Sequence, residues 1–285
     1  MLPGHPFRDR WALVTGGARG IGLAIARALL EQGSRVVIAD VDIAALDEAV
    51  AALSAHGEVH GVELDVTDAD AFHATVAQLE STHGALDILV NNAGIMRLGA
   101  FLERRPEEQD QQLDINLRGV MHGMRAALPA MKRRGRGHVV NIASTAGRVG
   151  LAHGAVYAAS KHAVIGLTEA VHAEVVDEGI DLSYICPAPV QTDLIAGLKP
   201  MRWPPVCTPE QVAAAVIDAI RRRRVEVYVP RAARLAAMLP SLLPRRAVAL
   251  VARVLGADRV FSEANPSERH SYEARLPGGA TTETS

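Results

Sequence analysis

The sequence has little cysteine and almost no net charge. It contains two cysteines, Cys186 and Cys207, and neither stands in a spacing typical of a metal site or a redox pair. This scarcity favours a reducing compartment, and nothing resembles a zinc cluster, so we predict no metal. The formal charge of −2 gives no overall electrostatic case for nucleic acid, and we predict none as a partner.

Long hydrophobic runs are also missing. No stretch reaches the length and purity of a transmembrane helix. The first residues, MLPGHPFRDRW, hold no apolar segment of the kind that secretory signals need. We therefore predict a cytoplasmic protein. A chain of 285 residues can bury a sizeable core in one domain or two.

What the sequence does contain is a regular alternation of short apolar runs and helical patterns. Continuous apolar strands separated by helices predict an α/β fold with a parallel sheet covered on both faces. The expected strands are residues 12–15, 35–40, 59–63, 88–91, 138–143, 182–186 and 226–229.

A glycine-rich turn follows the first expected strand, and a helical pattern begins at Ile21. Gly16 permits a tight turn, Gly20 lets the backbone approach a pyrophosphate, and Gly22 permits close packing of helix on strand. The helix N-terminus attracts phosphate charge. The spacing is GxxxGxG instead of the commoner GxGxxG. The strand–turn–helix context favours dinucleotide binding over an ordinary glycine turn.

The second expected strand ends at Asp40, about twenty residues past the glycine turn. A carboxylate there can accept hydrogen bonds from the adenosine ribose and repel a 2′-phosphate, which favours NAD over NADP. Arg19, inside the glycine turn, pulls the other way, because a cation can meet a phosphate. We give Asp40 more weight. Asp42 is an alternative cap for the next helix.

Ser144, Tyr157 and Lys161 form a second motif. Tyr157 and Lys161 are four residues apart and share one face of a helix. A lysine ammonium favours the phenolate, so we expect it to lower the tyrosine pKa towards neutrality and make an acid–base group. Ser144 can hydrogen-bond a carbonyl or alcohol oxygen. These are the parts needed to move a proton while a hydride moves elsewhere.

Together these segments resemble the classical short-chain dehydrogenase/reductase family. The matches stand in the family's order and spacing over about residues 9–230. They are Thr15-Gly16-x-x-x-Gly20-Ile21-Gly22, Asp65-Val66, Asn91-Asn92-Ala93-Gly94, Asn116, Ser144, Tyr157-x-x-x-Lys161 and Pro187-x-x-Val190-x-Thr192. One departure is Pro187-Ala188, where the family often has Pro-Gly. We expect a reshaped turn with function kept.

The resemblance implies a Rossmann-type doubly wound domain of about seven strands over residues 1–230. It also implies a catalytic set of Asn116, Ser144, Tyr157 and Lys161. Asn116, on a long helix ending near Met131, would hold a water that links Lys161 to solvent. A polar residue on the wet face of that helix is the alternative.

For the cofactor, the resemblance implies a longer set of contacts. Asp65 and Val66 would meet the adenine ring, although Asp65 is equally well explained as a turn or N-cap residue. The expected cofactor residues are Gly16, Arg19, Gly20, Ile21, Gly22, Asp40, Asp65, Val66, Asn92, Ala93, Gly94, Tyr157, Lys161, Pro187, Val190 and Thr192.

The expected activity is NAD(H)-dependent interconversion of a secondary alcohol and a ketone. The loop of residues 193–206 favours a hydrophobic substrate such as a steroid, retinoid or lipid, since it carries Leu194, Ile195, Leu198, Met201 and Trp203. The alternative is a catalytically silent NAD(P)-sensing or scaffolding protein on the same fold. The intact serine, tyrosine and lysine set argues against it.

Two features remain outside the motifs. Residues 231–276 read as a helical extension in which Pro240 and Pro244 break short amphipathic helices, and residues 277–285 as a disordered tail. The extension is a packing element, a lid or a membrane-surface contact, and we favour packing. The resemblance also implies a homodimer or homotetramer. Apolar stripes expected at its interface are Leu117, Val120, Met121, Met124, Ala127 and Leu128, with Ala163, Val164, Leu167 and Val171.

Overall fold

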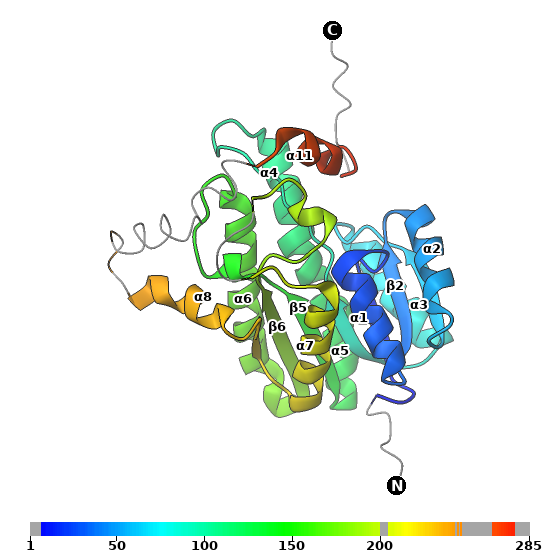
Figure 1. Ribbon diagram of the computed structural model, residues 1–285. Helices are drawn as coiled ribbons and strands as arrows, with labels where there is room; N and C mark the ends of the chain where they lie inside the picture. Colours follow the sequence, from blue (N-terminus) through cyan, green and yellow to red (C-terminus); the bar gives the residue numbers. More distant parts are fainter. Residues whose placement is uncertain (1–6, 200–204, 243, 245, 247–263, 277–285) are drawn as a thin grey trace.

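Seven parallel strands form one sheet in the order β3-β2-β1-β4-β5-β6-β7. Figure 1 shows the chain folded around this sheet. The computed structural model describes residues 7–199, 205–242, 244, 246 and 264–276. The strands are β1 (Trp11–Thr15), β2 (Arg35–Asp40), β3 (Val59–Glu63), β4 (Leu86–Asn91), β5 (Gly137–Ile142), β6 (Ile180–Pro187) and β7 (Glu226–Val229). All seven expected strands are confirmed, with ends that differ by at most two residues.

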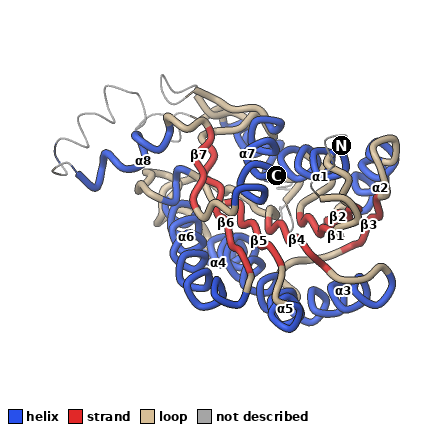
Figure 2. Tube along the Cα trace, turned by 90° about the horizontal axis from the view of Figure 1, so that it is seen from below, coloured by secondary structure: helices blue, strands red, loops and turns tan. Residues whose placement is uncertain are grey.

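Two layers of helices cover the sheet, as Figure 2 shows. The side chains of β1 alternate between them: Val14 joins the core beneath α1 and α7, whereas Leu13 joins the core beneath α3, α5 and α6. The helices are α1 (Gly20–Glu31), α2 (Ile43–Leu53), α3 (Ala69–Thr82), α4 (Pro106–Leu113), α5 (Gly119–Arg134), α6 (Ala155–Val175) and α7 (Pro209–Arg222). The predicted α/β fold is therefore confirmed.

The chain reverses its direction of winding between β1 and β4. β1 pairs with β2 on one side and with β4 on the other. The crevice at the carboxyl ends of strands where the order reverses is the usual ligand site of such sheets. Residues that follow β1 and β4 are therefore brought together there.

The C-terminal extension contains two described helices, α8 (Ala233–Leu242) and α11 (Pro266–Glu273). The predicted break at Pro240 is wrong, because α8 continues for two residues past it. A proline this near a helix end removes a single backbone bond, which a short last turn tolerates. The interval that includes residues 247–263, and the expected disordered tail 277–285, lie outside the described residues. Within the described chain, the helices are too short or too polar to cross a membrane.

Candidate active site

Thr15 and Asn92 join the carboxyl ends of β1 and β4. The Asn92 side chain donates to the carbonyls of Thr15 (2.9 Å) and Gly16 (3.0 Å). The Thr15 hydroxyl accepts from the backbone amides of Asn92 (3.0 Å) and Ala93 (3.2 Å). These bonds fix the segment that ends at Gly94 beside the glycine turn. No separate role was predicted for Thr15, although its place between strand and glycine turn could have indicated one.

The glycine turn is closely packed on itself. A Cβ on Gly22 would lie 2.0 Å from the carbonyl oxygen of Gly16, so a larger residue cannot enter without moving α1. Gly20 has φ +54, and a Cβ there would lie 3.2 Å from Thr192 Cγ2. Thr192, which follows β6, therefore faces the glycine turn. The N-cap residue of α1 makes no side-chain hydrogen bond to the helix, which leaves its first amides to an anion.

Two backbone amides hold the Asp40 carboxylate in place at the crevice. One carboxylate oxygen accepts from the amide of Ala18 at 3.1 Å, and the other from the amide of Asp42 at 3.3 Å. The Arg19 guanidinium pairs with Asp42, which also caps α2 by accepting from Ala45. The bond from Ala45 and the pairing with Arg19 lower the pKa of Asp42. The capping alternative for Asp42 is confirmed, and the charge of Arg19 is already countered.

Asp65 lies in a turn. Its carboxylate accepts from the amide (2.9 Å) and hydroxyl (2.8 Å) of Thr67, while Asp68 caps α3. The turn interpretation is confirmed, and the contact with adenine stays a prediction. Val66 is buried, with its carbonyl 3.0 Å from His122 Nδ1.

The segment after β6 runs along the same edge. Pro187 ends the strand, and the amide of Ala188 donates to Val229 at 2.7 Å. Val190 is buried and pairs with Cys207 in an isolated parallel bridge. The departure at Ala188 therefore leaves an ordered backbone that leads on to Thr192. A glycine is not required at position 188, because the backbone of Ala188 is not in the left-handed region.

The predicted catalytic side chains meet on α6 and at the end of β5. Tyr157 is 8% exposed and Lys161 5% exposed. The ammonium of Lys161 donates to the carbonyl of Ile142 at 2.8 Å and lies 5.9 Å from the centre of the Tyr157 ring. Ser144 accepts from the amide of Ala146 at 3.1 Å and also hydrogen-bonds Tyr157. The spacing in the sequence thus becomes a compact cluster.

Burial dominates the titration of this cluster. It raises the pKa of Tyr157 to about 12, and the hydrogen bond with Ser144 opposes the rise. It lowers the pKa of Lys161 to about 8, because an ammonium loses its hydration there. The expected lowering of the tyrosine pKa towards neutrality is therefore wrong for this structure. The lysine ammonium is directed to a carbonyl, and desolvation outweighs its attraction for a phenolate.

Asn116 lies in a π-helical turn, Asp114–Arg118, between α4 and α5. Its side chain is fully buried, accepts from the amide of Ile95 (2.8 Å) and donates to Ile95 O (2.9 Å) and Ser160 Oγ (3.2 Å). The alternative of a wet-face residue is wrong, because the π turn directs the side chain inward. A Cβ on Gly94 would lie 3.2 Å from Asn116 Oδ1 and 3.6 Å from Lys161 Nζ. Asn116 therefore borders the lysine.

An apolar wall adjoins Tyr157. Buried Met96, Leu98 and Ala146 pack in one cluster with the tyrosine, and half-buried leucines complete it. These leucines are Leu151, Leu194 and Leu198. The expected apolar lining by the loop after β6 is confirmed for its two leucines in this cluster. Met201 and Trp203 lie outside the described residues.

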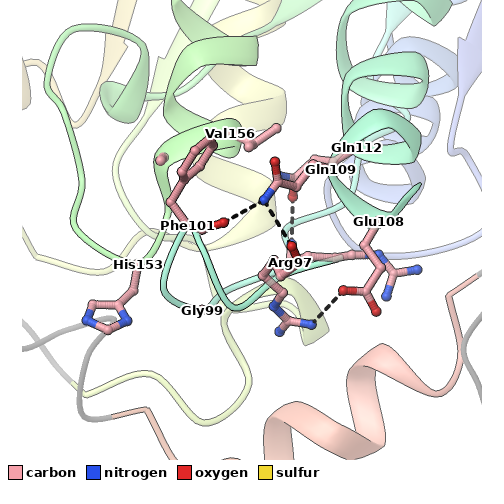
Figure 3. Close-up of a pocket in the computed structure, with 10 residues that line it drawn as sticks. Arg97, Gly99, Phe101, Glu108, Gln109, Gln112, His153 and Val156 are labelled. Carbon is pink, nitrogen blue, oxygen red and sulfur yellow. Dashed lines mark hydrogen bonds and ion pairs between the residues drawn. The ribbon is translucent and has the colours of Figure 1, made fainter. Parts of the chain in front are cut away.

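A small cleft lies under the segment that follows Arg97 (Figure 3). Gln109 donates across it to the carbonyl of Phe101 at 2.8 Å. His153 lines this cleft, whereas Arg148 pairs with Glu169 at 2.8 Å. The cleft does not include the catalytic tyrosine or serine among its lining residues.

One histidine group was not predicted. Ligand atoms of Glu58, His60 and His83 lie within 4.8 Å of one another. The two imidazoles stack with centroids 4.6 Å apart, and Glu58 pairs with Arg35 at 3.3 Å. Stacking and ion pairing account for the arrangement.

The residues around the crevice fit a dinucleotide. The uncapped first turn of α1 suits a pyrophosphate, and the Asp40 carboxylate stands at the end of β2 where a ribose would bind. The chain matches the short chain dehydrogenase family over residues 10–203. It belongs to the short-chain dehydrogenase/reductase family. The seven-stranded parallel sheet agrees with this membership.

Named relatives support the same assignment. This short-chain dehydrogenase/reductase is 36% identical over 221 residues to the ketoacyl reductase HetN of Nostoc sp., covering 76% of this chain and 77% of HetN. It is 38% identical over 187 residues to the D-beta-hydroxybutyrate dehydrogenase of Cupriavidus necator, covering 65% of this chain and 72% of that protein.

Solved structures of the family bind either nicotinamide cofactor. A short chain dehydrogenase/reductase from Burkholderia phymatum in complex with NAD matches with a TM-score of 0.75 and 28% identity, covering 86% of this chain and 96% of that one. A metagenomic short-chain oxidoreductase in complex with NADP matches with a TM-score of 0.67 and 31% identity, covering 78% and 97%. The chain is therefore an NAD(P)-dependent oxidoreductase that acts on CH–OH groups.

Proposed function

We propose that this protein interconverts a hydrophobic secondary alcohol and its ketone with NAD(H). The observation that carries the proposal is the convergence of Ser144, Tyr157, Lys161 and Asn116 at the crevice of the sheet. Proton transfer to a substrate oxygen uses a buried phenol beside a serine hydroxyl and an ammonium, whereas cofactor binding alone does not require the phenol and the hydroxyl. A bound nicotinamide supplies or accepts the hydride at the substrate carbon.

Tyr157 and Ser144 handle the substrate oxygen in this proposal. With a pKa of about 12, Tyr157 is protonated at neutral pH and is ready to donate a proton to a ketone oxygen. Ser144 already hydrogen-bonds the Tyr157 phenol. Its hydroxyl can therefore also polarise the substrate oxygen and keep that oxygen aligned with Tyr157. In the alcohol-to-ketone direction Tyr157 first loses its proton to solvent through the relay, and the phenolate then accepts the proton of the alcohol while Ser144 keeps its hydrogen bond to the substrate oxygen.

Lys161 and Asn116 support the proton transfer. A positive charge 5.9 Å from the tyrosine ring centre favours the phenolate that forms when the proton leaves. The side chains of Asn116 and Lys161 both lie close to Gly94. Asn116 also fixes the backbone of Ile95 with two hydrogen bonds. We assign Asn116 the role of completing the relay between Lys161 and solvent.

The cofactor preference is tested at Asp40. We expect NAD to bind at least about tenfold tighter than NADP, or roughly 1.4 kcal/mol, because the carboxylate repels a 2′-phosphate. Asp40→Ala should narrow this preference, measured by titration with both cofactors. Asp47→Ala, which removes an exposed carboxylate on α2, is the matched control and should leave the preference unchanged. Tighter NADP binding by the wild type would show that Arg19 dominates.

The alternative is a silent NAD(P)-sensing or scaffolding protein. It predicts cofactor binding without turnover. The experiment that separates the two is NADH formation on a panel of secondary alcohols, from short aliphatic to steroid. Turnover of any member supports the enzyme. Binding of NAD with no turnover on the whole panel supports the sensor.

We further propose a homodimer or homotetramer built on α5 and α6. Several residues of the expected stripes, such as Val120, Met124 and Val164, are buried within the single chain. The half-buried remainder available for an interface is Leu117, Met121, Leu128, Ala163, Leu167 and Val171. Light scattering at micromolar concentration should give at least twice the monomer mass. A monomer at that concentration would refute the assembly.

A further inference from the structure

The C-terminal helix α11 is packed on the catalytic side of the sheet (Figure 1). The amide of Asn265, just before it, donates to the carbonyl of Gly197 at 2.7 Å. Near its other end, the Tyr272 hydroxyl accepts from the amide of Met96 at 3.2 Å. Three segments far apart in sequence therefore meet here: the loop after β4, the loop after β6 and α11.

Arg269 is the central contact of α11. It is 6% exposed, and its guanidinium donates to the carbonyls of Leu194 (2.8 Å), Ala196 (3.4 Å) and Met96. The first two carbonyls belong to the loop after β6 and the third to the loop after β4. One buried side chain thus holds both loops. The planar guanidinium suits this task, because its donors point in several fixed directions.

A second anchor holds the far end of α11. The carboxylate of Glu273 accepts from Arg104 with two bonds of 2.8 and 2.9 Å. Arg104 also donates to the carbonyl of Leu98, and Glu273 accepts from the Leu98 amide at 3.5 Å. The bidentate pair is largely shielded from solvent, which makes it stronger than an exposed ion pair.

The loops that α11 holds are the ones that border the catalytic tyrosine. Met96 and Leu98 are buried in the apolar cluster with Tyr157, and Leu194 packs against that cluster. The match to the family ends at residue 203, so α11 lies beyond the matched part.

We propose that α11 is a wall of the substrate site and that Arg269 is a specificity-determining positioning residue, which holds Met96 and Leu194 against a large apolar substrate. The proposal rests on the proposed function and deepens it. A short ketone needs little more than the oxygen contacts of Tyr157 and Ser144. A long one must also be held along its chain, and the apolar wall supplies that contact only while α11 keeps the two loops together.

The test compares Arg269→Met with the wild type on methyl nonyl ketone and on butanone. Methionine keeps the apolar stem of arginine and removes every donor. We expect the ratio of kcat/KM for the long ketone to that for butanone to fall at least about tenfold. The fall should come from a higher KM for the long ketone. Hydrogen exchange at the amides of Met96 and Leu98 should speed up. His270→Ala, which changes an exposed neighbour on α11, is the matched control. It should leave both the kcat/KM ratio and the hydrogen exchange unchanged.

Affinity for methyl nonyl ketone, measured by calorimetry, gives a readout that needs no turnover, and it should weaken by a similar factor. Tyr272→Ala serves as a second variant if Arg269→Met fails to fold, and the same changes are expected. An unchanged or increased ratio, with unchanged affinity, would overturn the proposal and leave Arg269 a structural contact. If the wild type turns over neither ketone, affinity alone decides the role of α11, and the panel of secondary alcohols decides the proposed function separately.

Discussion

Replacing Tyr157 with phenylalanine is expected to lower turnover by about a hundredfold or more while NAD affinity barely changes. The substitution removes only the hydroxyl that exchanges the proton. The ring remains packed in the apolar cluster with Met96 and Leu98, so the fold should be kept. Steady-state kinetics with a secondary alcohol and NAD titration measure the two quantities separately.

Tyr228→Phe provides the control for Tyr157→Phe. Tyr228 is also buried, and its hydroxyl bonds Glu226 at 3.1 Å, away from the catalytic group. We expect it to keep near-normal turnover. Near-normal turnover in Tyr157→Phe would instead remove the tyrosine from the mechanism, and the proposed roles of Ser144 and Lys161 would have to be reassigned.

Replacing Lys161 with methionine is expected to abolish most activity and yet to stabilise the fold. Burial lowers the pKa of Lys161 from 10.5 to about 8, so about 3 kcal/mol opposes its ammonium in the folded protein. Methionine avoids this cost but leaves the carbonyl of Ile142 without its bond. We expect the free energy of unfolding at pH 7 to rise by about 1 to 2 kcal/mol, measured by urea denaturation.

The stabilisation expected from Lys161→Met depends on pH. Between pH 8 and 10.5 the unfolded chain binds a proton at Lys161 that the folded chain lacks, so wild-type stability rises with pH in that window. Below pH 8 both states hold the proton and the full burial cost applies. The advantage of Lys161→Met should therefore shrink above pH 8. Lys132→Met, at an exposed lysine paired with Glu178, should show little change at any pH. A lower stability of Lys161→Met at pH 7 would contradict the prediction.

Motifs with a local cause were predictable. Val59–Glu63 and Glu226–Val229 appear at the expected bounds, because strand formation follows the pattern of apolar residues between turn residues. The spacing of Tyr157 and Lys161 likewise follows from helical periodicity. Thr208 and Gln211 form a capping box, which their residue types and spacing predict.

Features that depend on burial were not predictable. The sign of the pKa shift at Tyr157 was misjudged, because the sequence shows the nearby lysine but not how far both groups are desolvated. The inward direction of Asn116 depends on a π turn, which a helical pattern does not reveal. Pro240 was expected to end a helix that in fact continues through it.

The sequence by itself determined the order of the strands along the chain, the glycine turn and the residue types of the catalytic cluster, because each depends on neighbours within a few positions. Only the tertiary structure decided that Arg269 and Tyr272 reach the loops beside Tyr157. Those contacts join residues more than one hundred and seventy positions apart in the chain. They depend on how the C-terminal chain packs over the sheet, and no local pattern of residues encodes that packing.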